Sequence, residues 1–173
     1  MTGPEIILRD ATLADSIALH RLNQASLPNV NSVSFEKFGD LFSEAAYCRI
    51  AEVSGEIGGF LLAFESTATY DSPNFIWFLE HYDKFAYIDR IIVSSNARRK
   101  GIASLLYNNL IKFSIDRGIS LITCEYNLRP PNEISRQFHE SFGFKEVGQQ
   151  DTEGEKKAGV ASGPTDRDIT HDL

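Results

Sequence analysis

The segment with the clearest chemistry is Arg98-x-x-Gly101-x-Ala103, which follows a predicted buried strand and precedes a predicted amphipathic helix. Backbone N–H groups at a helix N-terminus lack partners within the helix and carry partial positive charge, so an anion is stabilised there. A glycine lets the backbone approach such a ligand closely. Arg98, Arg99 and Lys100 add full positive charges at the same point. The segment therefore predicts a phosphate-binding loop.

This basic cluster stands out because the chain as a whole is acidic. The formal net charge is -7 over 173 residues, so we expect no bulk attraction to nucleic acid or to an anionic membrane surface. Cys48 and Cys124 lie in strand-like sequence without metal-ligand spacing, which favours buried thiols and no bound metal. The sequence shows no signal-peptide layout and no apolar run of membrane-spanning length. We expect a soluble, cytoplasmic protein.

Hydrophobic periodicity predicts the elements that must position the loop. The turn signal Ser54-Gly55-Glu56 separates two strand patterns and predicts a hairpin. The order of patterns predicts an α/β domain over residues 1–150, in which helices cover both faces of a mixed sheet. Residues 151–173 are expected to form a polar tail with at most one weak strand at 157–161. The predicted strands are 5–9, 47–53, 57–64, 86–93, 119–126 and 144–147, and the predicted helices are 12–26, 35–45, 102–117 and 133–141.

Two features interrupt these regular patterns. Gly58 and Gly59 lie inside a predicted strand and indicate a bulge or a close backbone approach. Residues 65–84 are too long for an ordinary strand connection and are rich in aromatic residues. They form a loop or short helix held by its own aromatics, a dimer contact, or a wall or lid of a substrate pocket.

The loop, taken from Val93 to Ala103, resembles the acetyl-CoA pyrophosphate loop of the GCN5-related N-acetyltransferases, whose pattern is Arg/Gln-x-x-Gly-x-Gly/Ala. A second segment resembles that family's other signature, an asparagine followed by an aromatic pair and then Gly-Phe. Its residues here are Asn132, Phe138, His139, Gly143 and Phe144. The two motifs have the family's order and spacing, and the resemblance covers about residues 6–148.

The resemblance implies an acyl-CoA N-acyltransferase fold with a central, mostly antiparallel mixed sheet. It implies acetyl-CoA as the donor and a primary amine as the acceptor, attacked directly. The backbone of Ile91, Ile92 and Val93 would bind the pantetheine arm and the acetyl carbonyl, and Asn132 would bond to the same arm. The pyrophosphate would be held by Arg98, Arg99, Lys100, Gly101, Ile102, Ala103 and Ser104.

Amine acetylation needs a base for the attacking amine, and stabilisation or protonation of the leaving thiolate. Glu125 is the first candidate for the base, because it resembles the position of a catalytic glutamate in several relatives. Asp89, on the neighbouring predicted strand, is the second. Each could instead be an ordinary strand carboxylate in a salt bridge, for instance with Arg90 or Arg129.

The candidate acid is His139, which stands where relatives usually carry tyrosine. A histidine is mostly neutral at neutral pH, so it would donate through a neutral N–H or after its pKa has been raised. Alternatively it packs, and water protonates the leaving group. A second departure is the C-terminal segment, whose residues have low propensity for the strand that normally completes the family's sheet. The sequence therefore does not define the acceptor side of the pocket or a homodimer formed through that edge.

Three function classes follow. The first is an N-acetyltransferase, with a small-molecule or amino-acid-like amine favoured over a protein acceptor by the aromatic insertion. The second is a catalytically silent acetyl-CoA-binding regulatory module, suggested by His139 and the unusual C-terminal segment. The third, a nucleotide-binding P-loop protein, is disfavoured because the loop is short and lacks Gly-Lys-Ser/Thr.

Overall fold

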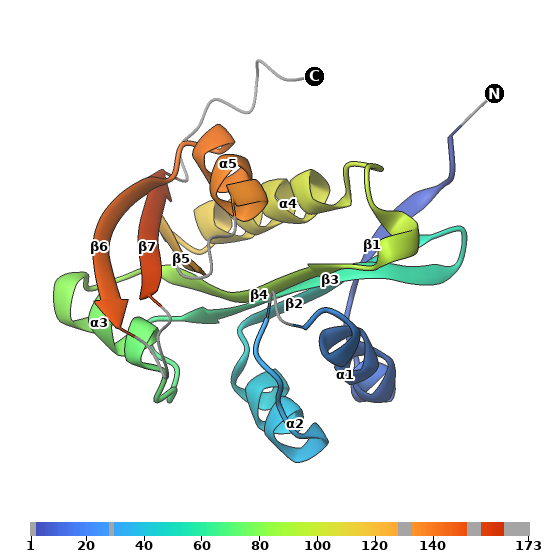
Figure 1. The fold of residues 1–173 in the computed structure, drawn as a ribbon, viewed down its shortest axis with the longest axis horizontal. Coiled ribbons are helices and arrows are strands. Elements are labelled where there is room, and N and C mark those ends of the chain that lie inside the picture. The colour runs from blue at the N-terminus through green and yellow to red at the C-terminus, as the bar shows by residue number, and fades with distance from the viewer. Residues whose placement is uncertain (1–2, 28–29, 128–132, 152–156, 165–173) are drawn as a thin grey trace. The chain divides into compact units, whose positions relative to one another are not determined.

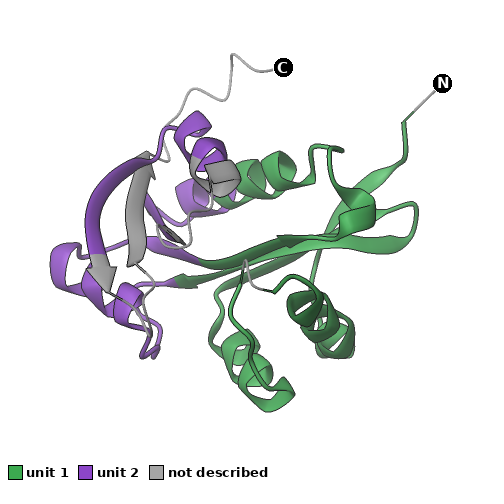
Figure 2. Cartoon of the chain, in the orientation of Figure 1, with its two compact units in different colours: residues 1–64, 89–110 green, residues 65–88, 111–173 purple. Residues whose placement is uncertain are grey.

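The computed structural model describes residues 3–27, 30–127, 133–151 and 157–164. The chain divides into two compact units, which Figure 2 distinguishes by colour. Unit 1 comprises residues 1–64 and 89–110, and unit 2 comprises residues 65–88 and 111–173. Strand β4 (Ala86–Val93) and helix α4 (Ile102–Asp116) each contribute to both units. No helix among the described ranges is long and apolar enough to cross a membrane.

The sheet of unit 1 is built from β1 (Ile6–Asp10), β2 (Tyr47–Val53), β3 (Glu56–Glu65) and the second half of β4, in that order. β2 pairs antiparallel with both β1 and β3. The predicted hairpin between β2 and β3 is confirmed. Its two turn residues, Ser54 and Gly55, have φ values of 51° and 84°, as a tight turn between twisted strands requires.

Helices cover both faces of the unit 1 sheet, as predicted. Helices α1 (Ser16–Ala25) and α2 (Phe35–Glu44) lie on one face, and the first half of α4 lies on the other (Figures 1 and 2). α2 begins at a capping residue, Ser34, whose hydroxyl accepts from the Lys37 N–H at 3.0 Å. The buried ring of Phe38 packs edge-on against Phe60 of β3, with 6.1 Å between the ring centroids.

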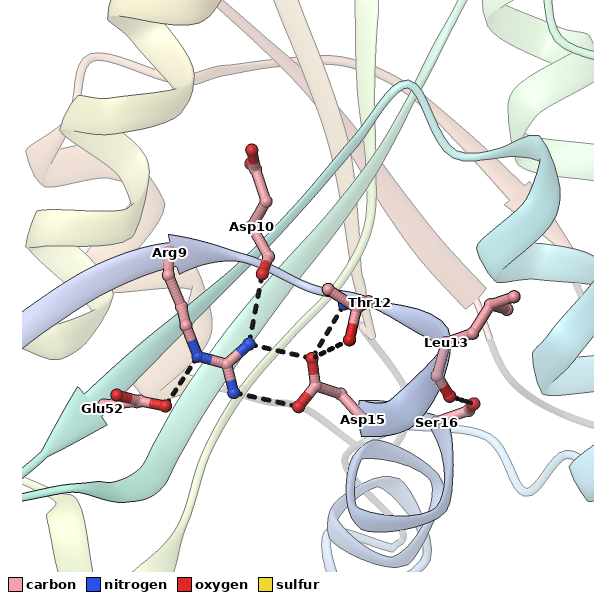
Figure 3. Close-up of polar contacts among 7 residues, drawn as sticks. All are labelled: Arg9, Asp10, Thr12, Leu13, Asp15, Ser16 and Glu52. Carbon is pink, nitrogen blue, oxygen red and sulfur yellow. Dashed lines mark hydrogen bonds and ion pairs between the residues drawn. The ribbon is translucent and has the colours of Figure 1, made fainter.

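The entry into α1 is tied to the sheet by a charged cluster, drawn in Figure 3. Both Arg9 terminal nitrogens donate to the Asp15 carboxylate at 2.9 Å, and its Nε donates to Glu52 of β2 at 2.6 Å. Asp15 also accepts from the Thr12 N–H at 2.8 Å, so Thr12 and Asp15 form a capping pair at the short 3-10 turn η1 (Leu13–Asp15). One carboxylate thus joins a strand to the start of a helix.

The sheet of unit 2 contains the first half of β4, then β5 (Leu121–Asn127), β7 (Lys157–Pro164) and β6 (Lys145–Asp151). β4 and β5 are parallel, and β7 pairs antiparallel with β5 on one side and β6 on the other. The weak strand expected at 157–161 is therefore β7, and it extends to Pro164. Helix α5 (Glu133–Ser141) occupies its predicted position.

The aromatic insertion contains a short helix, α3 (Pro73–His81), with proline at its first position. Phe75 and Phe78 are fully buried and pack on Phe85, with centroid separations of 5.7 and 5.9 Å. Trp77 covers Gly148 of β6, where an added Cβ would come within 2.5 Å of the indole. These contacts fit the alternative of a helix held by its own aromatics.

Candidate active site

The predicted phosphate loop lies in unit 1, between the end of β4 and the start of α4. A single 3-10 turn, η2 (Ser95–Ala97), leads into it. Ala97 and Ile102 anchor its two ends and are 4% and 2% exposed. Between them, Arg98, Arg99, Lys100 and Gly101 are exposed to solvent. The loop is therefore held at its two buried ends, while the positively charged residues between them face the solvent.

The backbone of this loop suits an anion. The first helical hydrogen bond of α4 runs from the Leu105 N–H to the Gly101 carbonyl at 3.0 Å. The N–H groups of Ile102, Ala103 and Ser104 therefore have no acceptor within the helix. Gly101 has φ of 76°, and a Cβ built on it would meet nothing within 4 Å, so open space adjoins the helix start. These residues fit the pyrophosphate of acetyl-CoA by charge, donors and room.

Gly58 and Gly59 of β3 pack against the two ends of the phosphate loop. Gly58 is the extra residue of a β-bulge, because Ala51 pairs with Gly59 while Glu52 pairs with Ile57. A Cβ on Gly58 would lie 3.0 Å from Ile102 and 3.2 Å from Ala97. The expected bulge and close approach are both observed. The sequence did not reveal that these glycines make room for Ala97 and Ile102, the buried residues at the two ends of the loop.

The second half of β4 carries the residues expected to bind the pantetheine arm. Ile92 is buried, and Ile91 and Val93 are half-buried. The strand is held to β3 at its end, where the Ser94 N–H donates to the Gly58 carbonyl at 2.8 Å. Strand end, loop and helix start therefore form one continuous segment, as the sequence predicted.

Asp89, the second candidate base, lies in a buried polar network. Its carboxylate accepts from Arg90 Nε at 2.7 Å, and the two side chains are 4% and 3% exposed. Arg90 also donates to Asn23 Oδ1 at 2.6 Å and to Asn31 Oδ1 at 3.4 Å. The salt bridge proposed from the sequence as the alternative for Asp89 is present. Sequence reasoning missed Asn23, the fully buried partner from α1.

This network also fixes the chain that follows α1. Asn23 Nδ2 donates to the Asn31 carbonyl at 3.2 Å and to Gln24 Oε1 at 3.0 Å. Gln24 in turn donates to the Ser32 hydroxyl at 2.9 Å. The connection between α1 and α2 is thus bonded to β4 through one arginine side chain.

Glu125, the first candidate base, lies on β5 in unit 2. Its Oε2 accepts a hydrogen bond of 3.1 Å from the hydroxyl of Tyr87, a wholly buried residue of β4. Cys124 beside it is 1% exposed, and burial followed by the Glu125 charge raises the pKa of this thiol well above its ordinary value. Cys48 is half-buried, and burial raises its pKa to about 12. Both cysteines are free thiols.

His139, the candidate acid, lies in the last turn of α5 and is 4% exposed. Its ring makes edge-on contacts with Phe138 and Phe144, at centroid separations of 5.8 and 5.4 Å. Its carbonyl accepts from the Phe144 N–H at 3.1 Å, which closes the turn into the next strand. Asn132 and Arg129 lie outside the described residues. Within the described ranges, no three His, Cys, Asp or Glu side chains are grouped so as to hold a metal ion.

Comparison with known proteins identifies the class. Residues 17–144 match the sequence profile of the acetyltransferase (GNAT) family. The ribosomal-protein-S18-alanine N-acetyltransferase of Escherichia coli is 17% identical, with a TM-score of 0.73 over 93% of this chain and 94% of that one. Ard1 from Thermoplasma volcanium is also 17% identical, with a TM-score of 0.76 over 92% and 97%. Arabidopsis thaliana NAA60, solved with a bisubstrate analogue, is 18% identical, with a TM-score of 0.73 over 92% and 98%.

None of the curated protein sequences matches the chain significantly. The family match spans well over half of the residues, so the chain belongs to the GNAT acetyltransferase family. It is an acetyl-CoA-dependent N-acetyltransferase. Its fold is the mixed α/β fold of that family, with a mostly antiparallel sheet in which β4 and β5 are the parallel pair. The family and fold inferred from the two motifs are confirmed.

Proposed function

We propose that this enzyme acetylates the primary amine of a small, partly apolar acceptor by direct attack on the acetyl carbonyl. The observation that carries the proposal is the loop at the start of α4, which combines exposed cations, helix N–H groups without an acceptor inside the helix, and open space at Gly101. In this proposal Arg98 to Ser104 hold the pyrophosphate. The backbone of Ile91 to Val93, together with Asn132, holds the pantetheine arm. When bound, acetyl-CoA supplies the activated acetyl group.

The proposed base is Glu125. An attacking amine must be neutral, and a carboxylate held by a hydrogen bond is a suitable acceptor for the proton that the amine loses. Asp89 is the second candidate. Its buried ion pair with Arg90 supports Glu125 over Asp89, because the Asp89 carboxylate is already bonded within a buried structural network.

The proposed acid is His139, donating an N–H toward the leaving thiolate. Its position in the second family motif supports this role. The ring also packs between Phe138 and Phe144, and substitution by phenylalanine separates this packing from proton donation. No step of this chemistry requires a metal, and we propose that none is bound. Because it uses acetyl-CoA, we propose a cytoplasmic location.

The proposed acceptor class is small amines or amino-acid-like compounds. The support is the aromatic insertion, where the half-buried Tyr70 lies 5.5 Å from Phe75 between ring centroids. Such rings suit a partly apolar acceptor carrying an amine. The similar E. coli protein bears the name of a protein acceptor, ribosomal protein S18, so peptide acceptors belong in the test.

The test is acetyl-CoA turnover, followed by free-thiol release, with alkylamines, phenethylamine, free amino acids and alanine-starting peptides. Calorimetric titration with acetyl-CoA runs on the same sample. We expect turnover with one small-amine class. Turnover confined to the peptides would overturn the acceptor proposal. Binding without turnover on any acceptor would instead favour a regulatory module, and absence of binding would refute the role of the loop.

A further inference from the structure

The hydrogen bond between Tyr87 and Glu125 joins a fully buried tyrosine to the proposed base. Tyr87 lies on β4 in register with Thr123 of β5, and Glu125 follows two residues later on β5. The Tyr87 hydroxyl donates to Glu125 Oε2 at 3.1 Å. Next to this pair, the Thr123 hydroxyl donates to the Ala86 carbonyl at 3.2 Å and fixes the two strands against each other.

The aromatic insertion holds the Tyr87 ring in place. Phe75 and Phe78 of α3 contact it with centroid separations of 5.5 and 5.9 Å, and Tyr70 lies at 6.3 Å. Three rings from one inserted segment thus converge on one tyrosine. A ring enclosed in this way keeps a single rotamer, and its hydroxyl stays at one point in the sheet.

We propose that Tyr87 is a positioning residue, which orients the Glu125 carboxylate and stabilises its ionised form. The aromatic insertion then acts on the reaction from a distance, by fixing Tyr87. This inference rests on the proposed function, in which Glu125 accepts the proton of the amine. A hydroxyl that donates to a carboxylate favours the charged form and restricts the carboxylate to one orientation. The fixed orientation aims the carboxylate at a proton that arrives from one direction, and the stabilised charge keeps it deprotonated, and so able to accept that proton, at lower pH.

Other titratable groups near Glu125 must be considered in the test. Among the described side chains they include the Tyr87 phenol from β4 and the Cys124 thiol on β5 itself. From β7, the residue in register with Glu125 is Val160. Because its raised pKa keeps the Cys124 thiol protonated at neutral pH, a change seen on removing the Tyr87 hydroxyl would report on the hydrogen bond.

The experiment is a carbon-13 NMR titration of glutamate side-chain carboxyls, which needs no acceptor. The Glu125 resonance is assigned by its loss in Glu125→Gln. In Tyr87→Phe we expect the Glu125 pKa to rise by about one pH unit, since a hydrogen bond to an ionised group is worth roughly that much. The matched control is Tyr82→Phe, which removes a hydroxyl from the ring that stacks on Phe78 at 6.2 Å. That control should leave the Glu125 titration unchanged.

The second measurement is the pH dependence of kcat, taken with the acceptor from the amine panel that turns over fastest. The acidic limb of kcat against pH should move to higher pH in Tyr87→Phe by the same amount, with acetyl-CoA affinity unchanged. A residue that only packed would lower stability without moving this limb. If the Glu125 pKa rises but no acceptor turns over, the positioning role stands and the proposed acceptor class fails.

One outcome overturns the inference directly: a folded Tyr87→Phe protein with the same Glu125 pKa as the Tyr82→Phe control. If Tyr87→Phe does not fold, an NMR titration of the wild-type protein tests the hydrogen bond instead. The Tyr87 phenol carbon resonance should then follow the Glu125 titration, and this transition should vanish in Glu125→Gln. A phenol resonance that ignores the state of Glu125 would refute the hydrogen bond and the positioning role with it.

Discussion

A Cβ added to Gly59 would lie 2.6 Å from the carbonyl oxygen of Ile92. That distance is shorter than Cβ contacts allow, so the two strands could not approach as they do with any other residue at this position. The same Cβ would lie 3.3 Å from Ile102, the first residue of α4. The close spacing of β3 and β4 therefore depends on the absence of a side chain at Gly59. The position of Ile102, at the end of the phosphate loop, depends on it as well.

Replacing Gly59 with alanine should accordingly weaken both the fold and cofactor binding. We expect Gly59→Ala to lose about 1–3 kcal/mol of unfolding free energy from overpacking. The acetyl-CoA dissociation constant should rise about tenfold, or about 1.4 kcal/mol. Calorimetric titration and urea unfolding measure the two effects.

Gly39→Ala is the matched control for this prediction, because a Cβ on Gly39 in α2 meets nothing within 4 Å. Alanine has the higher helix propensity, so this variant should be as stable as the wild type or slightly more stable. Equal acetyl-CoA affinity in Gly59→Ala and Gly39→Ala would contradict the proposal that Gly59 positions the phosphate loop.

The Asp89–Arg90 pair predicts asymmetric effects on stability. Arg90→Met leaves a buried carboxylate without its ion-pair partner and should cost about 3–5 kcal/mol. Asp89→Asn leaves the guanidinium bonded to Asn23 and Asn31, and should cost about 1–3 kcal/mol. The double variant should be more stable than the sum of the two losses implies, which a double-mutant cycle in urea measures.

The same variants separate the two candidate bases. If Asp89 is structural, folded Asp89→Asn keeps its kcat within roughly twofold, whereas Glu125→Gln loses on the order of 100-fold or more. A large loss of kcat in Asp89→Asn, with stability preserved, would instead make Asp89 the base.

For His139, substitution by phenylalanine separates chemistry from packing. Phenylalanine preserves an aromatic ring between Phe138 and Phe144 but cannot donate an N–H. We expect kcat to fall about 100-fold, as loss of a general acid does, with little change in acetyl-CoA affinity. His139→Tyr, which restores a donor at the same position, should recover part of the rate. Full activity in His139→Phe would show that the residue only packs.

The Arg9–Asp15 pair predicts a dependence of stability on pH. Hydrogen bonds from Arg9 lower the pKa of Asp15 from 3.8 to about 2. Since the folded-state pKa lies below the unfolded one, the stabilisation is complete above about pH 4 and is lost as the pH falls toward 2. Asp15→Asn should cost about 1–2 kcal/mol at pH 7 and much less at pH 2.5.

Urea unfolding at both pH values checks this prediction, with Asp10→Asn as the control. The Asp10 side chain is 78% exposed in its pair with Arg49, so its loss should change little at either pH. An Asp15→Asn penalty that is equal at pH 7 and pH 2.5 would rule out the charged pair as its cause.

Local patterns predicted the elements but not the contacts between them. Strands 47–53 and 86–93 were predicted with the observed bounds, because alternation and turn residues mark them. The hydrogen bond from Arg90 to Asn23 spans 67 residues and that from Tyr87 to Glu125 spans 38. Such pairs leave no periodic trace in one sequence. The roles of Gly58 and Gly59 were visible only as an anomaly inside a strand.

β7 shows the opposite limit of sequence reasoning. Its residues, Lys157–Pro164, are mostly small and include Gly159 and Gly163, which have low strand propensity. Pairing with β5 and β6 on its two sides stabilises it as a strand despite this composition. Tertiary hydrogen bonding therefore outweighed local preference, which is why the sequence predicted only a weak strand over 157–161 and not the full length of β7.

The place of β7 also sets the order of events during translation. β5 and β6 are both synthesised before β7, yet β7 lies between them in the hydrogen-bonding order. Until Pro164 has emerged from the ribosome, β5 and β6 each lack the neighbour that β7 provides. The growing chain therefore carries unpaired edges on β5 and β6 from their synthesis until β7 becomes available. Such edges are the kind of surface on which nascent chains aggregate or recruit chaperones.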